Sequence, residues 1–281
     1  MSFHPLVVAQ KNFILPLHAH PTTEQIQAVA SAHAVVLPLV CPPALGAVVA
    51  ALGRAHFPRP WAMGAFNGKV GNYRLFKALG LAHPPTREFA EARQVLEAWD
   101  RGEFRGWGLP VVVKGAGGGQ GGNVALVGRR QELVKALERL EPRTRFGPPG
   151  LVVQRFIPQA RDLRVELVGG LVKAYWRVPA PGQWKANLSL GGRWEEAGEG
   201  RQEREGIGLA RRLADAAGID VAGVDVIFDQ GRAFLLEINF FSGRRAFGSG
   251  REFNALVVEA VRRWLKGLGI DPQQVQLAPE A

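Results

Sequence analysis

Two carboxylates and an amide lie close together in the stretch between residues 223 and 239. Two apolar runs, 223–228 and 233–239, flank a turn rich in polar residues and glycine, which predicts a β-hairpin. Glu237 and Asn239 are two residues apart and share one face of a strand, and Asp225 lies opposite Glu237 if three residues form the loop. Carboxylate and amide oxygens are hard ligands of the kind that Mg²⁺ takes. The hairpin is therefore a candidate magnesium site; the alternative is the solvated face of an ordinary hairpin.

A glycine-rich segment follows an apolar run that ends in a lysine. Residues 110–114 are expected to form a buried strand with Lys114 at its end, and glycine dominates residues 115–123. The backbone N–H groups of such a loop can bind a phosphate chain beside the lysine. It is not a Walker A loop, because no Gly-Lys-Ser/Thr follows and the loop leads into a strand. The pattern favours a phosphate-binding loop over the alternative, a flexible linker.

The surrounding pattern divides the chain into three parts that would position these groups. Residues 1–66 are expected to form a small α/β N-terminal domain. Residues 67–150 would form a central unit with the glycine-rich lid, and residues 151–281 a C-terminal unit with the metal site.

Local signals place several elements within these parts. Thr22 and Gln25 have the spacing of a capping box, which predicts a helix directly after Thr22. Thr86 follows two prolines and is expected to cap a helix. Apolar runs on both sides of Gly169-Gly170 predict a second hairpin, and the residues after Pro272 are expected to be a loose tail.

The composition is that of a globular chain: of 281 residues, 47% are hydrophobic and 21% charged, and the formal net charge is +10. No apolar run is long enough to span a membrane and no secretory leader is seen, so we expect a cytoplasmic protein that does not cross a membrane. The single cysteine, Cys41, excludes an internal disulfide. The basic charge favours an anionic ligand, but no Lys/Arg tract or nucleic-acid motif accompanies it, so nucleic acid is not expected as a partner.

Taken in order along residues 67–265, the motifs resemble those of the ATP-grasp superfamily, and most closely those of RimK-type ligases and bacterial glutathione synthetase. The segments that carry the resemblance are Gly68-Lys69, Gly80, Pro84-Pro85-Thr86, Val112-Val113-Lys114 with the glycine-rich loop, Val153 to Ile157, Asp162 to Val165, Trp176-Arg177, Asn187 with Gly191-Gly192, Gly223 to Asp225, and Glu237 to Asn239. The resemblance implies an α+β protein with the ATP-grasp fold, in which two α+β subdomains grip ATP, here preceded by the small α/β domain.

The resemblance also implies roles for individual residues. The residues that match ATP-binding positions are Lys69, Lys114, Gly118, Gly119, Gln120, Gly121, Gln154, Phe156, Ile157 and Asp162. Those that match positions around the transferred phosphoryl group, and hence catalytic residues, are Arg164, Arg177 and Asn187. Those that match the ligands of Mg²⁺, or of Mn²⁺ in its place, are Asp225, Glu237 and Asn239.

Three features depart from the pattern of these relatives. Arg155 stands where they commonly have glutamate. Asn123 replaces a loop glycine, although asparagine tolerates a positive φ better than most residues. Residues 240–245, Phe-Phe-Ser-Gly-Arg-Arg, replace the usual small residues and proline after the metal ligands, so the relatives' substrates cannot be transferred.

The resemblance implies an ATP- and Mg²⁺-dependent carboxylate–amine ligation, in which a carboxylate becomes an acyl phosphate and is then attacked by an amine. The expected partners are a small molecule or peptide with a carboxylate and an amine-bearing co-substrate. The sequence is compatible with either a monomer or a homo-oligomer. One alternative is a nucleotide-binding regulator of the same fold, which would be expected to have lost a metal ligand, yet all three are present. A nucleic-acid-binding protein is a further alternative that rests on the charge alone.

Arg244 and Arg245 are candidates for substrate binding because they follow Asn239 within six residues. A guanidinium can donate two parallel hydrogen bonds to a carboxylate, and Phe240 and Phe241 would lower the local dielectric. The alternative is that both arginines are solvated or pair with acids such as Glu252.

Overall fold

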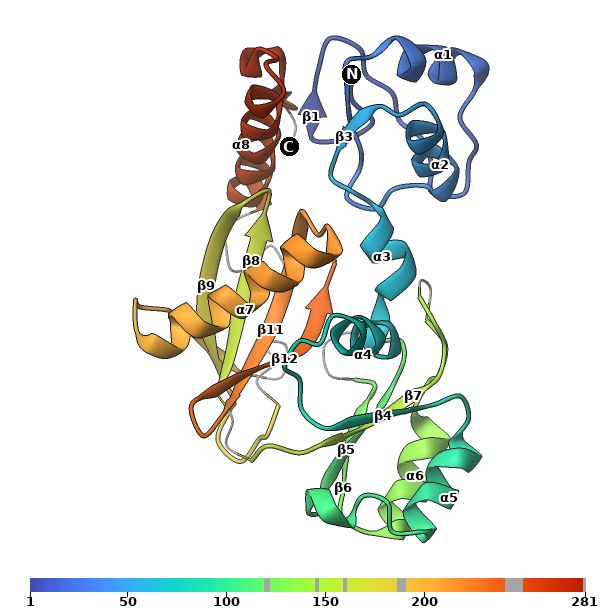
Figure 1. Cartoon of the computed structure of the whole chain (residues 1–281), viewed down its shortest axis with the longest axis vertical. Helices are drawn as coiled ribbons and strands as arrows, with labels where there is room; N and C mark the ends of the chain where they lie inside the picture. Colours follow the sequence, from blue (N-terminus) through green and yellow to red (C-terminus); the bar gives the residue numbers. More distant parts are fainter. Residues whose placement is uncertain (119–121, 145–146, 159–160, 186–190, 241–249, 280–281) are drawn as a thin grey trace.

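The computed structural model describes residues 1–118, 122–144, 147–158, 161–185, 191–240 and 250–279. A small N-terminal unit lies at one end of the molecule and a four-stranded sheet at the other, with a five-stranded sheet between them (Figure 1). This mixed arrangement of sheets and helices is the α+β class that the sequence predicts.

The N-terminal unit is a small α/β layer. Strands β2 (Ala34–Val36) and β3 (Ala55–Phe57) pair in parallel, and helices α1 (Thr23–Ser31) and α2 (Pro43–Ala51) complete it. The predicted capping box is confirmed, because Thr22 Oγ1 accepts from the Gln25 N–H and the Gln25 side chain accepts from the Thr22 N–H.

The C-terminal segment pairs with the start of the chain. Strand β1 (Val7–Val8) is antiparallel to β13 (Gln276–Leu277), and the 3₁₀ helix η4 (Pro272–Gln274) precedes β13. Val275 is buried in the same cluster as helix α8 (Gly250–Gly267). The expectation of a loose tail after Pro272 is therefore wrong, because this segment finds its partners in residues far away in the sequence.

The four-stranded sheet is antiparallel in the order β4 (Thr86–Phe89), β7 (Leu151–Arg155), β5 (Val111–Gly115) and β6 (Val124–Val127). Helices α5 (Ala92–Asp100) and α6 (Arg130–Arg139) share a core with it, and the 3₁₀ helix η1 (Arg105–Trp107) lies in the connection after α5. The sheet extends to Arg155, past the predicted boundary at residue 150, because Leu151 and Val153 belong to the same core.

Thr86 does not cap a helix, contrary to the sequence-based expectation. It is the first residue of β4, and the N-cap of α5 is Glu91. The side chain of Thr86 is buried and donates instead to the carbonyl oxygen of Pro84 at 2.7 Å.

The five-stranded sheet is also antiparallel, in the order β10 (Arg193–Glu196), β9 (Leu171–Val178), β8 (Asp162–Val168), β11 (Val221–Asp229) and β12 (Arg232–Asn239). The predicted hairpin around Gly169-Gly170 is confirmed as β8 and β9. Both glycines have positive φ, 55° and 88°, which is the conformation that a tight two-residue hairpin turn requires.

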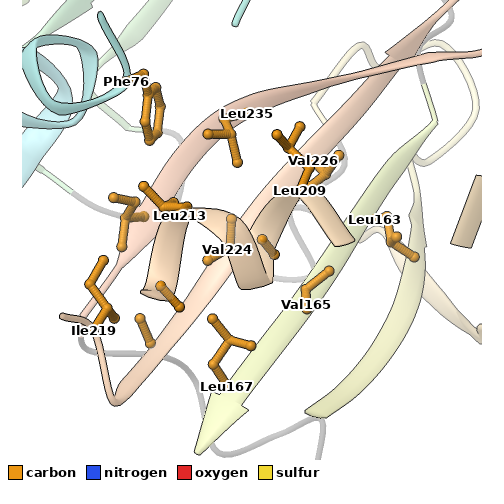
Figure 2. Close-up of a cluster of buried hydrophobic side chains, with 14 of the residues drawn as sticks. Phe76, Leu163, Val165, Leu167, Leu209, Leu213, Ile219, Val224, Val226 and Leu235 are labelled. Atoms are coloured by element: carbon orange, nitrogen blue, oxygen red, sulfur yellow. The ribbon is translucent and has the colours of Figure 1, made fainter. Parts of the chain in front are cut away.

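Helix α7 (Arg201–Ala217) covers one face of this sheet. Its Leu209 and Leu213 pack against an apolar face that includes Leu163, Val224 and Leu235 (Figure 2). Because side chains alternate along a strand, the residues between these apolar positions are directed to the opposite face. Packing against α7 thus decides which face of the sheet is left for charged residues.

The β11–β12 hairpin has a shorter turn than predicted, but it pairs Asp225 with the predicted residue. The turn contains two residues, Gln230 and Gly231, with φ of 51° and 81°, rather than three. A register shift next to Asp225 leaves Leu236 as an extra residue, which is a β-bulge. The bulge restores the shift that a three-residue loop would have given, so Asp225 pairs with Glu237 as predicted.

Helices α3 (Trp61–Phe66) and α4 (Gly68–Ala78) connect the N-terminal unit to the rest of the molecule. Helix α4 lies between the two large sheets, where it contacts both β7 and β12 (Figure 1). Within the described residues, no helix combines the length and apolar character needed to cross a membrane.

Candidate active site

Charged side chains gather on the face of the five-stranded sheet that α7 leaves uncovered. Asp225 of β11 is paired on one side with Arg164 of β8 and on the other with Glu237 of β12. One step along, Asp162 of β8 is paired with Arg177 of β9. Directly paired residues of antiparallel strands share a face, so the register alone brings these groups together.

Asp225 is the centre of a buried network of ion pairs. Its Oδ1 lies 2.5 Å from Arg164 Nε, and its Oδ2 lies 2.8 Å from Arg177 Nη2. Arg177 Nη2 also lies 2.5 Å from Asp162 Oδ2. The four side chains are only 6–11% exposed, and a charge this deeply buried is strongly destabilising once its partner is removed.

Burial and neighbouring charges shift the proton affinities of this network. Burial raises the pKa of Asp162 to about 6, with Asp225 adding to the shift and Arg177 opposing it. Burial also disfavours the charge of Arg177, but Asp162 and Asp225 outweigh that effect and raise the Arg177 pKa. Arg177 is therefore a permanent buried cation.

Two lysines approach the same region from the four-stranded sheet and α4. Lys69 Nζ donates to the carbonyl oxygens of Gly117 and Gly118, at 3.1 and 2.9 Å, and lies 3.8 Å from Glu237 Oε1. Lys114 Nζ donates to Gln154 Oε1 at 2.7 Å. Lys69 therefore joins the glycine-rich loop to the strand that carries the candidate metal ligands.

A pocket contains both ammonium groups. Lys69, Lys114 and Gln154 line it together with Thr86 and the rings of Tyr73, Phe76 and His83. Gln154 Nε2 donates to Thr86 Oγ1 at 2.9 Å, so the amide that accepts the hydrogen bond from Lys114 is itself held in place. Two neighbouring cations suit an anion such as a phosphate chain.

Burial lowers the pKa of Lys114 to about 8, an effect that Glu237 opposes and Lys69 reinforces. The lysine lacks a directly bonded carboxylate in the described structure, since the atom that accepts its hydrogen bond is the neutral amide oxygen of Gln154. An anion bound beside it would stabilise the charged form.

Asn123 organises the end of the glycine-rich loop. Its Nδ2 donates to the carbonyl oxygens of Gly117 and Glu141, and its Oδ1 accepts from the Glu141 N–H at 2.9 Å. Its φ is not positive, because Gln230 alone among the described non-glycine residues has a positive φ. Asparagine is thus used here for its hydrogen bonds, and its tolerance of a positive φ is not needed at this position.

The residues present fit a hard divalent cation. Asp225 and Glu237 face each other in register, and Asn239 adds an amide whose Nδ2 lies 3.3 Å from Asp225 Oδ2. Asp225 Oδ1 is buried against Arg164 Nε, and a carboxylate oxygen has a second lone pair that could face a cation. Within the described residues, no three His, Cys, Asp or Glu side chains form a metal cluster, and the Asn239 amide is the candidate for a third ligand among them.

Several predicted residues lie outside this cluster or outside the described residues. Ile157 is buried, and the Phe156 ring makes an edge-on contact with Trp184. Arg155 pairs with Asp229, so its charge is balanced at the end of the hairpin. The predicted residues that fall outside the described ranges are Gly119, Gln120, Gly121, Asn187, Arg244 and Arg245.

One buried side chain near the site was not predicted. Asn72 of α4 accepts a hydrogen bond from the Ile238 N–H, between the candidate ligands Glu237 and Asn239. Its spacing of three residues from Lys69 places both on one side of the helix. That spacing was the only available signal, and it points to a shared face without identifying the strand that the face meets.

Comparison with known proteins agrees with this geometry. Residues 82–258 match the model of the RimK-like ATP-grasp domain. Because this match covers more than half of the chain, the protein belongs to the RimK-like ATP-grasp family.

A sequence relative, the probable alpha-L-glutamate ligase of Parasynechococcus marenigrum (strain WH8102), is 32% identical over 174 residues, which are 59% of this chain and 36% of the relative. The chain thus matches only about a third of that protein's length. Among solved structures, the RimK domain ATP-grasp protein of Sphaerobacter thermophilus DSM 20745 has a TM-score of 0.56 at 19% identity, covering 81% of each chain. The D-alanine–D-alanine ligase of Bacillus anthracis complexed with ATP has a TM-score of 0.58 at 16% identity, covering 91% of this chain and 88% of that one. These structures establish the ATP-grasp fold.

Proposed function

We propose that this protein is an ATP- and Mg²⁺-dependent ligase that joins a carboxylate to an amine. The observation that carries the proposal is the contact between Lys69 and Glu237, 3.8 Å apart, which brings the lysine pocket and the acidic sheet face into one site. Family membership and the ligase names of the relatives support the same reaction class.

In this proposal Lys69, beside the glycine-rich loop, and Lys114, at the end of β5, bind the phosphates of ATP. Asp225, Glu237 and Asn239 would hold Mg²⁺, which when bound supplies neutralisation of phosphate charge. Arg177, buried and always charged, would offer guanidinium N–H groups to the phosphoryl group in transfer.

The proposed ligation has two steps. A carboxylate oxygen of the acid substrate attacks the γ-phosphorus of ATP, and the bond to ADP breaks. The amine then attacks the acyl carbon of the resulting acyl phosphate, inorganic phosphate leaves, and the amine loses a proton. The residues described here position and neutralise the reacting groups and form no covalent bond to either substrate.

The test is a screen for ADP release stimulated by pairs of acids and amines, with product masses measured by mass spectrometry. Glutamate and glutamyl peptides should be among the compounds tested, because the relative is named a probable alpha-L-glutamate ligase. Glu237→Ala is the control, because it should abolish turnover while the protein stays folded. Nucleotide binding without turnover for every pair would favour the regulatory alternative, and salt-sensitive DNA binding without nucleotide binding would contradict the proposal.

A further inference from the structure

Strand β12 is the edge strand of its sheet, and helix α4 with the loop after it covers that edge. The Leu235 N–H donates to the carbonyl oxygen of Ala82, and the Ile238 N–H donates to Asn72 Oδ1; both distances are 2.8 Å. The bulge at Leu236 lies between these two bonds. Before the bulge, the backbone N–H groups that point away from the sheet belong to odd-numbered residues such as Leu235, and after it to even-numbered residues such as Ile238. The side chains of Glu237 and Asn239 therefore lie on the Asp225 face.

The amide of Asn72 is fixed at both ends. Its Nδ2 donates to the Phe66 carbonyl oxygen at 2.8 Å, so its Oδ1 must face the Ile238 N–H. The Phe66 carbonyl can approach because residue 71 is glycine: a Cβ there would lie 2.6 Å from the Phe66 oxygen. Asn72 and Ile238 are both 2% exposed, so water does not compete for the bond.

We propose that Asn72 is a positioning residue, which holds the segment Glu237–Asn239 so that its two candidate metal ligands keep their place opposite Asp225. This inference rests on the proposed metal site. Lys69, one turn earlier on α4, contacts Glu237 itself, so one helix face fixes both the backbone and a side chain of the ligand strand.

The test measures Mn²⁺ binding in the presence of a non-hydrolysable ATP analogue, from the electron paramagnetic resonance signal of free Mn²⁺. Asn72→Leu removes the acceptor and should weaken Mn²⁺ binding about tenfold, as expected when a residue supporting metal ligands is lost. Asn72→Asp keeps the acceptor for Ile238 but loses the donor to Phe66, and it should bind Mn²⁺ nearly as tightly as the wild type.

Glu205 offers a matched control on the same strand. Its Oε1 accepts from the Ala233 N–H at 2.9 Å, near the turn of the hairpin and away from the candidate ligands. Glu205→Leu removes a comparable side-chain bond to β12 and should leave Mn²⁺ binding unchanged. If Asn72→Leu does not fold, Asn72→Ser, whose hydroxyl is too short to reach Ile238, replaces it in the comparison.

The outcomes separate this inference from the proposed function. If Asn72→Leu or its replacement binds Mn²⁺ like the wild type, or if Glu205→Leu or Asn72→Asp loses as much affinity, the positioning role is overturned while the metal site stands. If the wild type binds no Mn²⁺ with the nucleotide, or if Glu237→Ala binds it as tightly as the wild type, the metal assignment and this inference both fail.

Discussion

At the scale of single residues, burial lowers the pKa of Lys114 into the pH range in which enzymes commonly work. Its pKa falls to about 8 in the folded protein, whereas the pKa of a lysine in an unfolded chain is about 10.4. Between these values the unfolded chain holds a proton that the folded chain has released. The stability contribution of this group therefore increases as the pH rises from 8 toward the unfolded value.

Nucleotide affinity should change with pH in the opposite direction. Deprotonated Lys114 cannot attract phosphate, so we predict that ATP binding weakens above pH 8, by up to about tenfold per pH unit. Calorimetric titration with MgATP between about pH 7 and 9.5 measures this. Lys114→Met should bind weakly with no such pH dependence, and a constant wild-type affinity across the range would contradict the assignment.

Arg244 and Arg245 remain predicted substrate residues. Once an acid substrate is known, Arg244→Ala or Arg245→Ala should raise its KM about 10- to 100-fold if that arginine binds a second carboxylate. The KM for ATP should barely change, because Arg177 and the lysines face the phosphates in the proposed site. Steady-state kinetics of the two variants measures both constants. If the KM for the acid is unchanged in both variants, or if the KM for ATP rises equally, these arginines do not select the substrate.

At the scale of elements, the packing of α7 leaves no room for a side chain at Gly206. A Cβ there would lie 2.7 Å from Leu163 Cδ2 and 3.1 Å from Phe228 Cζ, both inside the core of the sheet. At Gly208 of the same helix, the nearest atom is the end of the Arg212 side chain, 3.6 Å away. The helix therefore contacts the sheet closely at Gly206, whereas Gly208 lies away from it.

We predict that Gly206→Ala destabilises the protein by about 1–3 kcal/mol through overpacking. Gly208→Ala should instead stabilise it by about 0.5–1 kcal/mol, because alanine favours a helix. Urea unfolding of both variants against the wild type checks the pair. Equal shifts in the same direction would show that α7 does not pack as closely as the structure indicates.

At the scale of the whole molecule, α4 and the glycine-rich loop join the two large sheets. Lys69 contacts loop carbonyls on one side and Glu237 on the other. A bound nucleotide would compete with the loop for this ammonium group and offer phosphate oxygens to the loop N–H groups. The loop is therefore the segment whose surroundings should change most on binding.

We predict that MgATP slows amide hydrogen exchange across residues 115–123, because phosphate oxygens would accept hydrogen bonds from the backbone N–H groups of this glycine-rich segment. Exchange detected by mass spectrometry measures this. The turn at Gly169-Gly170, which lies against Phe57 and Ala260, serves as the internal control and should not respond. Equal exchange of the loop with and without nucleotide would argue against a lid.

Much of the site could be predicted from local sequence. Alternation along a strand places Glu237 and Asn239 on one face, and this regularity depends only on backbone geometry. The capping box at Thr22 and the turn at Gly169-Gly170 are equally local, and both are confirmed. The order of motifs along the chain was enough to indicate the family, because the residues that could bind phosphate and metal keep their spacing.

The tertiary structure decided which long-range partners these residues meet. The bulge at Leu236 lies between the hydrogen bonds that the edge of β12 donates to Asn72 of α4 and to Ala82 after it, and no local pattern predicts these contacts. Thr86 supports Gln154 across two strands instead of capping a helix, and Val275 is buried beside α8 instead of lying in a loose tail. In each case the free energy comes from burying a polar bond or an apolar side chain against a distant segment. Such partners are created only when the chain folds.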